Sequence, residues 1–468
     1  MTIDEARALL DAHGQGHVMR FWDTLDAVRR ADLLAQIDTL NFENIAYMKS
    51  QIEAAGAAPA AALLAPAPVI ELAEVTRRTA ADDVAARGRA HLAAGKVGVI
   101  LVAGGQGSRL GYDGPKGCYE IGPISGASLF EIHARKILAL ERRFGTEVPF
   151  YIMTSDVNDA PTRAFFAEHA WFGLDPARVQ FFVQGMWPAL WPDGRIILDE
   201  PGHIFMSPDG HGGTLSALRD RGMLDDMRTR GLETLFYFQV DNPLVEIADP
   251  TFVGLHLATG ADISVKVCAK RDPGEGLGVV ARAGDRDLIV EYTELTDAQK
   301  TARTADGRLR FLFGSVAIHV FARTFLEQEA AARLPLHVAH KKVPYCDDDG
   351  APVKPDAANA YKFEKFIFDV LPDAKVCTHV EFSREEEFSP VKNAEGNDSP
   401  ATCRRDMMRK FARWLMAVGV AVPVDADGTP RYRIEIDPCF APGPDELRGK
   451  VDGLVVDGDL LLTEEEED

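Results

Sequence analysis

The stretch VGVILVAGGQGSRLGYDGPK, residues 97–116, limits what the rest of the chain can fold into. It begins with an aliphatic run, Val97 to Val102, of the kind found in strands that are buried on both faces of a parallel sheet. Three glycines follow the strand: Gly104, Gly105 and Gly107. Glycine can adopt φ > 0 and lets a ligand approach the backbone, so these amides are suited to cradle a phosphate.

Two cationic side chains, Arg109 and Lys116, close the loop and favour an anion site over a plain turn with two solvated charges. The common nucleotide signatures do not fit. A Walker-type loop needs GxxxxGK[ST], but Lys116 is followed by Gly117. The dinucleotide pattern GxGxxG fails because its third glycine position is occupied by Leu110.

Composition narrows the class of protein. The 468 residues are 46% hydrophobic and 26% charged, as in ordinary globular proteins, and the net charge of −21 argues against a nucleic-acid partner. A phosphate site in such a chain must be a local cluster of positively charged side chains, and Arg109, Lys116 and Lys392 are candidates for it. The six cysteines form no CxxC pair, so we expect neither a zinc site nor a disulfide framework. With no signal-peptide pattern at the N-terminus, a cytoplasmic protein is expected.

The chain is predicted to contain three regions. Residues 1–95 form an N-terminal helical region that contains an Ala/Pro linker. Residues 96–384 form a Rossmann-like catalytic domain with a β extension for the sugar, and residues 385–468 form a C-terminal domain with an acidic tail. The longest uncharged stretch, 54–70, carries three prolines, which excludes a membrane helix and favours the linker.

Strands and helices alternate after residue 95. Strands are predicted at 97–102, 149–153, 179–184, 234–240 and 262–268, and helices at 160–169, 213–230 and 251–259. This alternation predicts an α/β fold with a doubly wound, Rossmann-like, mostly parallel sheet and a small α+β C-terminal domain. Short strands past 270 suggest an antiparallel extension over the sheet, and residues 361–371 look helical.

Polar residues follow three of the predicted strands. Gln184 and Asp241 stand at such ends, as does the glycine loop, and ligands in doubly wound sheets bind beyond the carboxyl ends of strands. A carboxylate at the end of a buried strand is either a turn or helix-cap residue or a metal ligand. Opposite an anion loop, we favour Asp241 as a ligand for Mg²⁺, which binds few carboxylates and substrate phosphates.

A second glycine-rich turn, FMSPDGHGG, covers residues 205–213. Gly210 can offer its backbone to the edge of a base, and the donor and acceptor of Gln184 suit the imide edge of uracil. Either residue could instead be a turn former or a satisfied polar group. His211 could be only an exposed loop residue. No GxSxG or HExxH motif is present, so the sequence gives no support to hydrolase chemistry.

Taken together, these motifs resemble the eukaryotic-type UDP-sugar pyrophosphorylase family, and most closely its UDP-N-acetylglucosamine branch. The resemblance rests on LVAGGQGSRLGYDGPKG (101–117), PFYIMTS (149–155), FFVQGMWPA (181–189), SPDGHGGTLSAL (207–218), VDNPLVEIADP (240–250), VVARAGDRDLIVEYTE (279–294), HVAHKKVPY (337–345), YKFEKFIFD (361–369) and EEEFSPVKN (385–393).

The resemblance implies a role for each matching residue. The nucleotide is bound by Gly104, Gly105, Gln184 and Gly210, the last two reading uracil; the phosphates by Arg109, Lys116 and Lys392; Mg²⁺ by Asp241; and the sugar by His211, Glu291, Tyr292, Gly314 and Ser315. Two positions depart from the N-acetylglucosamine branch. His211 stands where that branch has the asparagine of PDGNGG, as in the glucose branches, and Ser315 stands where it has the last asparagine of NAGN.

The implied activity is that of a uridylyltransferase. It would form a UDP-sugar and pyrophosphate from UTP and a sugar 1-phosphate, with N-acetylglucosamine 1-phosphate as the leading candidate. A glucose-specific or broad-range enzyme is the alternative that His211 and Ser315 favour. A non-catalytic nucleotide-sugar sensor belongs to a different class, and a dinucleotide-dependent oxidoreductase is disfavoured by the failed fingerprint. We expect a monomer or weak homo-oligomer without nucleic-acid or membrane partners.

Overall fold

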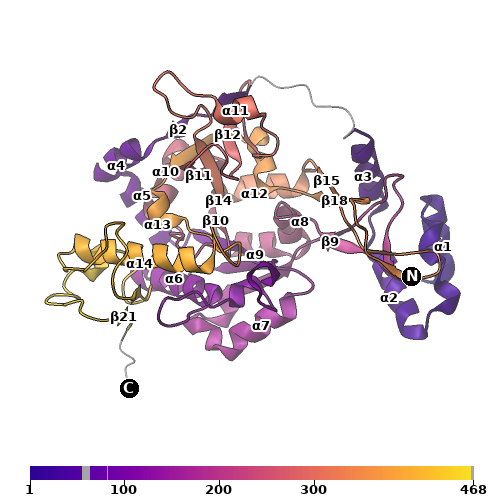
Figure 1. Cartoon of the computed structure of the whole chain (residues 1–468), viewed down its shortest axis with the longest axis horizontal. Coiled ribbons are helices and arrows are strands. Elements are labelled where there is room, and N and C mark those ends of the chain that lie inside the picture. The colour runs from indigo at the N-terminus through magenta and orange to yellow at the C-terminus, as the bar shows by residue number, and fades with distance from the viewer. Residues whose placement is uncertain (55–63, 82, 465–468) are drawn as a thin grey trace. The chain divides into compact units, whose positions relative to one another are not determined.

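The structure, a computed structural model, describes residues 1–54, 64–81 and 83–464 (Figure 1). The chain forms two compact units. The first consists of Met1–Ala62, Gln184–Ser216 and Arg333–Asp369, and the second of Leu63–Val183, Ala217–Ala332 and Val370–Asp468. The boundaries expected after residues 95 and 384 stay predictions.

Helices and hairpins build the first unit. Its helices include α1 (Ile3–Ala12), α2 (Ala27–Thr39) and α3 (Phe42–Ala54). Its antiparallel strand pairs are β6 (Met186–Pro188) with β9 (Met206–Pro208), β7 (Leu198–Glu200) with β8 (His203–Ile204), β15 (His337–Lys341) with β18 (Ala360–Glu364), and β16 (Tyr345–Cys346) with β17 (Pro352–Val353). Asp26 begins α2 by accepting a hydrogen bond from the Arg29 amide at 2.9 Å. Leu33 and Ile37, one turn apart on α2, are fully buried in the core of this unit together with Phe363 of β18.

The predicted helix at 361–371 is wrong. Residues up to Glu364 belong to β18, and a short 3₁₀ helix, η7 (Ile367–Asp373), follows. β18 pairs with β15 over five residues, from His337 opposite Glu364 to Lys341 opposite Ala360. The partner strand overrides the local helical pattern, because cross-strand hydrogen bonds satisfy this backbone as an isolated helix would have done.

The second unit is built on a mostly parallel sheet, which confirms the predicted fold class. Its strand order is β2-β19-β11-β14-β10-β3-β4-β5. The strands are β2 (Val69–Ile70), β3 (Val97–Val102), β4 (Phe150–Thr154), β5 (Val179–Val183), β10 (Thr234–Gln239), β11 (Ile263–Ala269), β14 (Phe313–Ala322) and β19 (Cys377–Glu381). Strands β10, β3, β4 and β5 are parallel neighbours, so their carboxyl ends meet at one edge of the sheet.

The expected antiparallel extension over the sheet is only partly correct. β14 lies within the sheet, antiparallel to both β10 and β11. It therefore begins at the edge where β10 ends. β12 (Val279–Ala283) pairs with β13 (Arg286–Val290) and with β1 (Leu64–Pro66), and joins β14 through Val279 opposite Gly314. Part of the predicted linker therefore forms strands, Leu64–Pro66 in β1 and Val69–Ile70 in β2, while residues 55–63 lie outside the described part of the chain.

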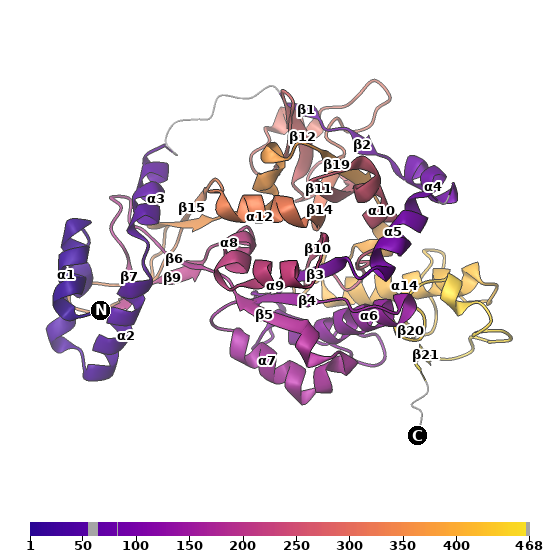
Figure 2. The same cartoon turned by 180° about the vertical axis from the view of Figure 1, so that it is seen from behind.

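Helices cover the sheet of the second unit (Figure 2). They include α4 (Leu72–Ala80), α5 (Asp83–Ala93), α6 (Leu129–Phe144), α7 (Asp159–Glu168), α10 (Pro250–Thr259), α12 (Arg323–Ala331) and α14 (Pro400–Ala417). Val97, Val99 and Leu101 of β3 are buried in one core with residues of α6 and α10. The helix predicted at 213–230 is instead two, α8 (Gly213–Asp220) and α9 (Met223–Thr229), because Gly222 adopts φ +76° between them.

The C-terminal region joins the same unit. α14 lies beside α6 in both views (Figures 1 and 2), and β20 (Ile434–Ile436) pairs with β21 (Leu460–Leu462). Glu464, the first residue of the predicted acidic tail, forms an ion pair with Arg142 of α6; residues 465–468 lie outside the described part. Among the described residues, no helix combines the length and the apolarity that a bilayer span requires.

Candidate nucleotide site

The glycine loop of the second unit is a closed hairpin. Gln106 and Pro115 form a β-bridge, and the Lys116 amide donates to the Gly105 carbonyl at 3.0 Å. The expectation that φ > 0 is used at Gly104, Gly105 and Gly107 is wrong: in this loop only Gly111 and Gly114 have positive φ. The bridge keeps the first part of the loop extended.

Two of these glycines serve different purposes. A Cβ added to Gly105, which is exposed, would meet no atom within 4 Å, so its backbone is open to a ligand. A Cβ at Gly107 would lie 2.8 Å from the Tyr112 ring, so that glycine is needed for packing. Only the first arrangement suits a phosphate or base that approaches the main chain.

Asn158, which the sequence reasoning missed, holds the beginning of this loop. Its side-chain amide donates to the Ala103 carbonyl at 3.0 Å, and its side-chain oxygen accepts from the Ser155 amide at 2.7 Å. Asn158 is fully buried at the end of the segment that follows β4. The PFYIMTS motif marked this strand, but nothing in the sequence indicated that an asparagine three residues later would reach back to β3.

The structure brings the glycine loop and Asp241 together. The Nζ atom of Lys116 lies 3.9 Å from Oδ2 of Asp241, and the two side chains are only 16% and 13% exposed. Asp241 follows β10, which is the direct neighbour of β3 in the sheet. Asp241 also lies near the beginning of α14. There its carboxylate and that of Asp406 act with burial to raise the pKa of the Cys403 thiol.

The other two predicted phosphate-binding cations belong to the same unit. The Val391 amide donates to the Asp241 carbonyl at 2.8 Å, so Lys392 follows a residue that is bonded directly to Asp241. Lys392 is half-buried, and its own amide donates to the Asp398 carbonyl at 2.7 Å. Arg109 is exposed on a 3₁₀ turn, Ser108–Leu110, and forms no ion pair with any described residue.

The predicted sugar residues of this unit gather around residues 276–278. The Ser315 amide donates to the Gly278 carbonyl at 2.8 Å, and a Cβ on Gly278 would lie 3.1 Å from Oε1 of Glu291. A Cβ on Gly314 would lie 2.8 Å from Cβ of Leu277, and a Cβ on Gly276 would lie 3.5 Å from the Tyr292 ring. Gly314 and Ser315 begin β14, so they lie at the same edge of the sheet as the carboxyl end of β10.

Asp241 fits a magnesium ion that arrives with its substrate. Among the described residues, two groups of three His, Cys, Asp or Glu side chains lie close enough to share a metal ion, and Asp241 belongs to neither. Asp241 therefore offers a partly buried carboxylate outside any such three-residue group. Mg²⁺ is commonly held in that way, by one or two carboxylates with the remaining positions filled by phosphate oxygens and water.

The first unit contains Gln184 and Gly210. The Asp209 amide donates to the Gly185 carbonyl at 3.0 Å, which joins the two segments that carry these residues. Gln184 is 7% exposed, and its side-chain amide has no hydrogen-bond partner among the described residues. Its amide atoms are not among the buried side-chain atoms that lack a partner, so they are accessible, and a ligand with one donor and one acceptor would pair with them.

Asp209, beside Gly210, is a further residue that the sequence reasoning missed. It is 2% exposed; Oδ2 lies 3.2 Å from Nζ of Lys365, and Oδ1 has no hydrogen-bond partner among the described residues. Burial raises the pKa of Asp209 to about 6, although Lys365 opposes the shift. The Lys365 amide also donates to the Asp209 carbonyl at 2.8 Å, so this pair holds the glycine turn by main chain and side chain.

His211 is a neutral donor rather than an exposed loop residue. Its ring stacks on Phe366, with centroids 5.1 Å apart, and burial together with His337 lowers its pKa to about 4. Its Nδ1 accepts a hydrogen bond from the Ile367 amide at 3.2 Å. The proton of the neutral ring is therefore on Nε2, which becomes a donor.

Comparisons with known proteins show similarity along nearly the whole chain. The family described as UTP–glucose-1-phosphate uridylyltransferase matches residues 68–400. UDP-N-acetylhexosamine pyrophosphorylase-like protein 1 of Homo sapiens is 38% identical over an alignment of 497 residues, covering 99% of this chain and 97% of that protein. UDP-N-acetylglucosamine diphosphorylase 2 of Arabidopsis thaliana is 36% identical and covers 92% and 88% of the two chains. The solved uridine diphosphate N-acetylglucosamine pyrophosphorylase of Trypanosoma brucei, in complex with inhibitor, superposes with a TM-score of 0.86 at 26% identity, covering 99% and 98%.

Proposed function

Because the chain belongs to the UTP–glucose-1-phosphate uridylyltransferase family, we propose that it joins UTP to N-acetylglucosamine 1-phosphate, forming a UDP-sugar and pyrophosphate. The observation that carries this proposal is the approach of Lys116, from the glycine loop, to Asp241 at the edge where the parallel strands end. A cation and a carboxylate held together beneath an open backbone suit a triphosphate and its metal ion.

Charge repulsion is the main obstacle to this reaction. An oxygen of the sugar 1-phosphate attacks the α-phosphorus of UTP, the bond from that phosphorus to the β-phosphate oxygen breaks, and pyrophosphate leaves in line. The attacking phosphate is already an anion at neutral pH, since its second pKa is about 6. The protein therefore needs no general base, but it must hold two anions together.

The residues of the second unit supply that neutralisation. Arg109 presents a planar guanidinium from the exposed turn of the glycine loop, and Lys116 presents an ammonium beside Asp241. Lys392 would add a third cation from the segment bonded to the Asp241 main chain. Bound Mg²⁺ would stabilise the charge on the phosphates. Fixed charges of this kind act without reorganising during the reaction.

The uracil and the sugar are assigned to other residues. We assign the imide edge of uracil to the unpartnered amide of Gln184 and to the Gly210 backbone. The sugar is assigned to Glu291, Tyr292, Gly314 and Ser315, with His211 as a neutral donor through Nε2. A second candidate, a glucose-specific or broad-range enzyme, is favoured by Ser315 and His211, since each replaces an asparagine of the N-acetylglucosamine pattern.

Pyrophosphate release tests the reaction and the sugar together. The full chain is incubated with UTP, Mg²⁺ and either N-acetylglucosamine 1-phosphate or glucose 1-phosphate. We expect release with both the metal and the sugar phosphate present, and a higher kcat/KM for the N-acetylated sugar. A preference for glucose 1-phosphate would overturn the sugar assignment alone. Binding of UTP without release of pyrophosphate from either mixture would identify a sensor instead of an enzyme.

A further inference from the structure

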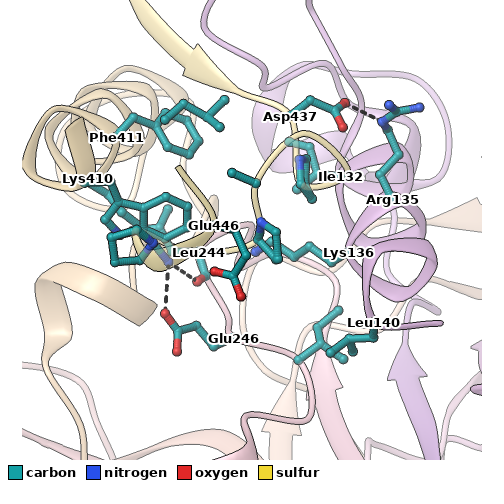
Figure 3. Close-up of a pocket in the computed structure, with 18 of the residues that line it drawn as sticks. Ile132, Arg135, Lys136, Leu140, Leu244, Glu246, Lys410, Phe411, Asp437 and Glu446 are labelled. Atoms are coloured by element: carbon teal, nitrogen blue, oxygen red, sulfur yellow. Dashed lines mark hydrogen bonds and ion pairs between the residues drawn. The ribbon is translucent and has the colours of Figure 1, made fainter. Parts of the chain in front are cut away.

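Two lysines from different helices end on the loop that follows Asp241. Lys136 of α6 donates to the carbonyls of Pro243, at 2.5 Å, and Val245, at 2.7 Å. Lys410 of α14 donates to the Leu244 carbonyl at 3.2 Å. Figure 3 shows the two side chains entering from opposite sides of this loop. Three successive carbonyls are thus held by two cationic side chains.

These lysines are costly to place where they are. Lys410 is 4% exposed, and burial together with the nearby Lys410 lowers the pKa of Lys136 well below its ordinary value. Buried cations are tolerated when they are hydrogen-bonded or paired. Here the partners are mainly backbone carbonyls, and one carboxylate, Glu246, lies 3.7 Å from Lys410. Lys410 is buried and Lys136 is half-buried, and both direct their donors to this one short segment.

A cavity lies beside the loop that the lysines hold. A space of about 980 Å³ lies between α6, α14 and the C-terminal segment, lined in part by Leu140, Phe411 and both lysines (Figure 3). The side chains of Leu244 and Val245 are buried in the core of the unit, and the two lysines fix the main-chain carbonyls of the same segment by directed hydrogen bonds.

The same contacts connect the two halves of the predicted catalytic centre. Lys410 also donates to the Glu386 carbonyl at 2.6 Å. The side chain of Asn242 donates to the Glu387 carbonyl at 2.7 Å and accepts from the Ser389 amide at 3.2 Å. Lys410 therefore ties the segment after Asp241 to the segment that leads to Lys392.

We propose that Lys136 and Lys410 are positioning residues: by holding the main chain of residues 243–245, they keep the Asp241 carboxylate in the orientation that binds the divalent ion. The proposal rests on the proposed function, since it takes Asp241 as the metal ligand. Neither lysine is assigned a contact with the substrate. Their effect on the divalent ion is transmitted through Asp241.

The test replaces each lysine by methionine, which keeps an unbranched side chain and removes the donors. With Mn²⁺ as the probe, free metal is measured by electron paramagnetic resonance of the full-length protein at saturating UTP. We expect the Mn²⁺ dissociation constant of Lys136→Met and of Lys410→Met to rise about 10-fold or more, the scale seen when groups that orient metal ligands are removed. Lys450→Met, which removes a lysine bonded to the Phe440 carbonyl elsewhere in the C-terminal region, should leave it unchanged.

Folded variants with parental Mn²⁺ affinity would overturn the proposal. If a methionine variant fails to fold, the glutamine variant at the same position, which is too short to reach the same carbonyls, is measured for the same rise. Asp241→Ala separates the metal role of Asp241 from the positioning role of the two lysines. Unchanged Mn²⁺ binding in that variant would refute the metal role of Asp241. An active parent whose lysine variants bind Mn²⁺ normally would refute only the positioning role.

Discussion

The two glycine-rich loops of this protein handle charge in opposite ways. In the loop of the second unit, Arg109 is exposed and Lys116 meets Asp241 in a partly open position. In the loop of the first unit, Asp209 is 2% exposed and its charge is matched internally by Lys365. There the glycines make room for the carboxylate: a Cβ on Gly213 would lie 1.9 Å from its Oδ1.

This difference suggests two kinds of ligand group. Accessible cations beside an open backbone suit phosphates, whose charge must be neutralised. A loop whose charges are matched internally presents a rigid main chain and the neutral amide of Gln184, which suits an uncharged base. Substitutions around the loop of the second unit should therefore change the rate of reaction. Substitutions around the loop of the first unit should change which nucleotide is used.

The largest effect is expected from the residues that we assign to the phosphates and the metal ion. Asp241→Ala or Lys392→Ala should lower kcat by about 10²-fold or more, the scale for losing one group that stabilises a transition state. Steady-state pyrophosphate release measures it. Asp285→Ala and Lys375→Ala, which change exposed residues of the same unit, serve as matched controls. A variant with near-parental turnover would remove its residue from the scheme.

Gln184→Leu should have the next largest effect and should act on nucleotide choice. If Gln184 binds uracil as proposed, loss of its amide leaves the imide edge unpaired, at a cost of about 1–3 kcal/mol. We expect kcat/KM for UTP to fall while the low activity with CTP changes little, so the ratio of the two shrinks. Gln180→Leu, whose amide donates to the Ala177 carbonyl, is the control. An unchanged UTP/CTP ratio would contradict the assignment.

Ser315→Asn should change the choice of sugar by a smaller factor. It restores the asparagine of the N-acetylglucosamine pattern, and one added hydrogen bond contributes about 1 kcal/mol, or about five-fold. The kcat/KM ratio of N-acetylglucosamine 1-phosphate to glucose 1-phosphate is expected to rise. Ser50→Asn, at an exposed position of α3, should not alter the ratio. A ratio that stays constant would show that Ser315 does not face the acetamido group.

The smallest effect is a dependence on pH. With a pKa raised to about 6, Asp209 is charged at pH 7.5 and gains a proton as the pH falls through 6, which weakens its attraction to Lys365. The KM for UTP of Asp209→Asn should exceed that of the parent at pH 7.5 by a few-fold, and the two should converge at pH 5.5. Titration of UTP itself affects both proteins equally. Asp356→Asn, at an exposed site, should follow the parent throughout.

Much of the fold was predictable because its signals are local. The run from Val97 to Val102 indicated a buried strand, and β3 covers these residues with all but Val102 buried. The pairing of β18 with β15 and the place of β14 inside the sheet were not predictable, because strand partners are chosen by residues far away in the chain.

The candidate site divides in the same way. Residue chemistry and order alone determined that a glycine loop with two cations belongs with a carboxylate at a strand end. Only the tertiary structure decided that Lys116 reaches Asp241, that Asn158 holds the loop, and that Lys136 and Lys410 hold the segment beyond Asp241. The physical reason is that periodicity and turn chemistry act over a few residues, whereas hydrogen bonds to backbone carbonyls leave no trace in the sequence of the segment that accepts them.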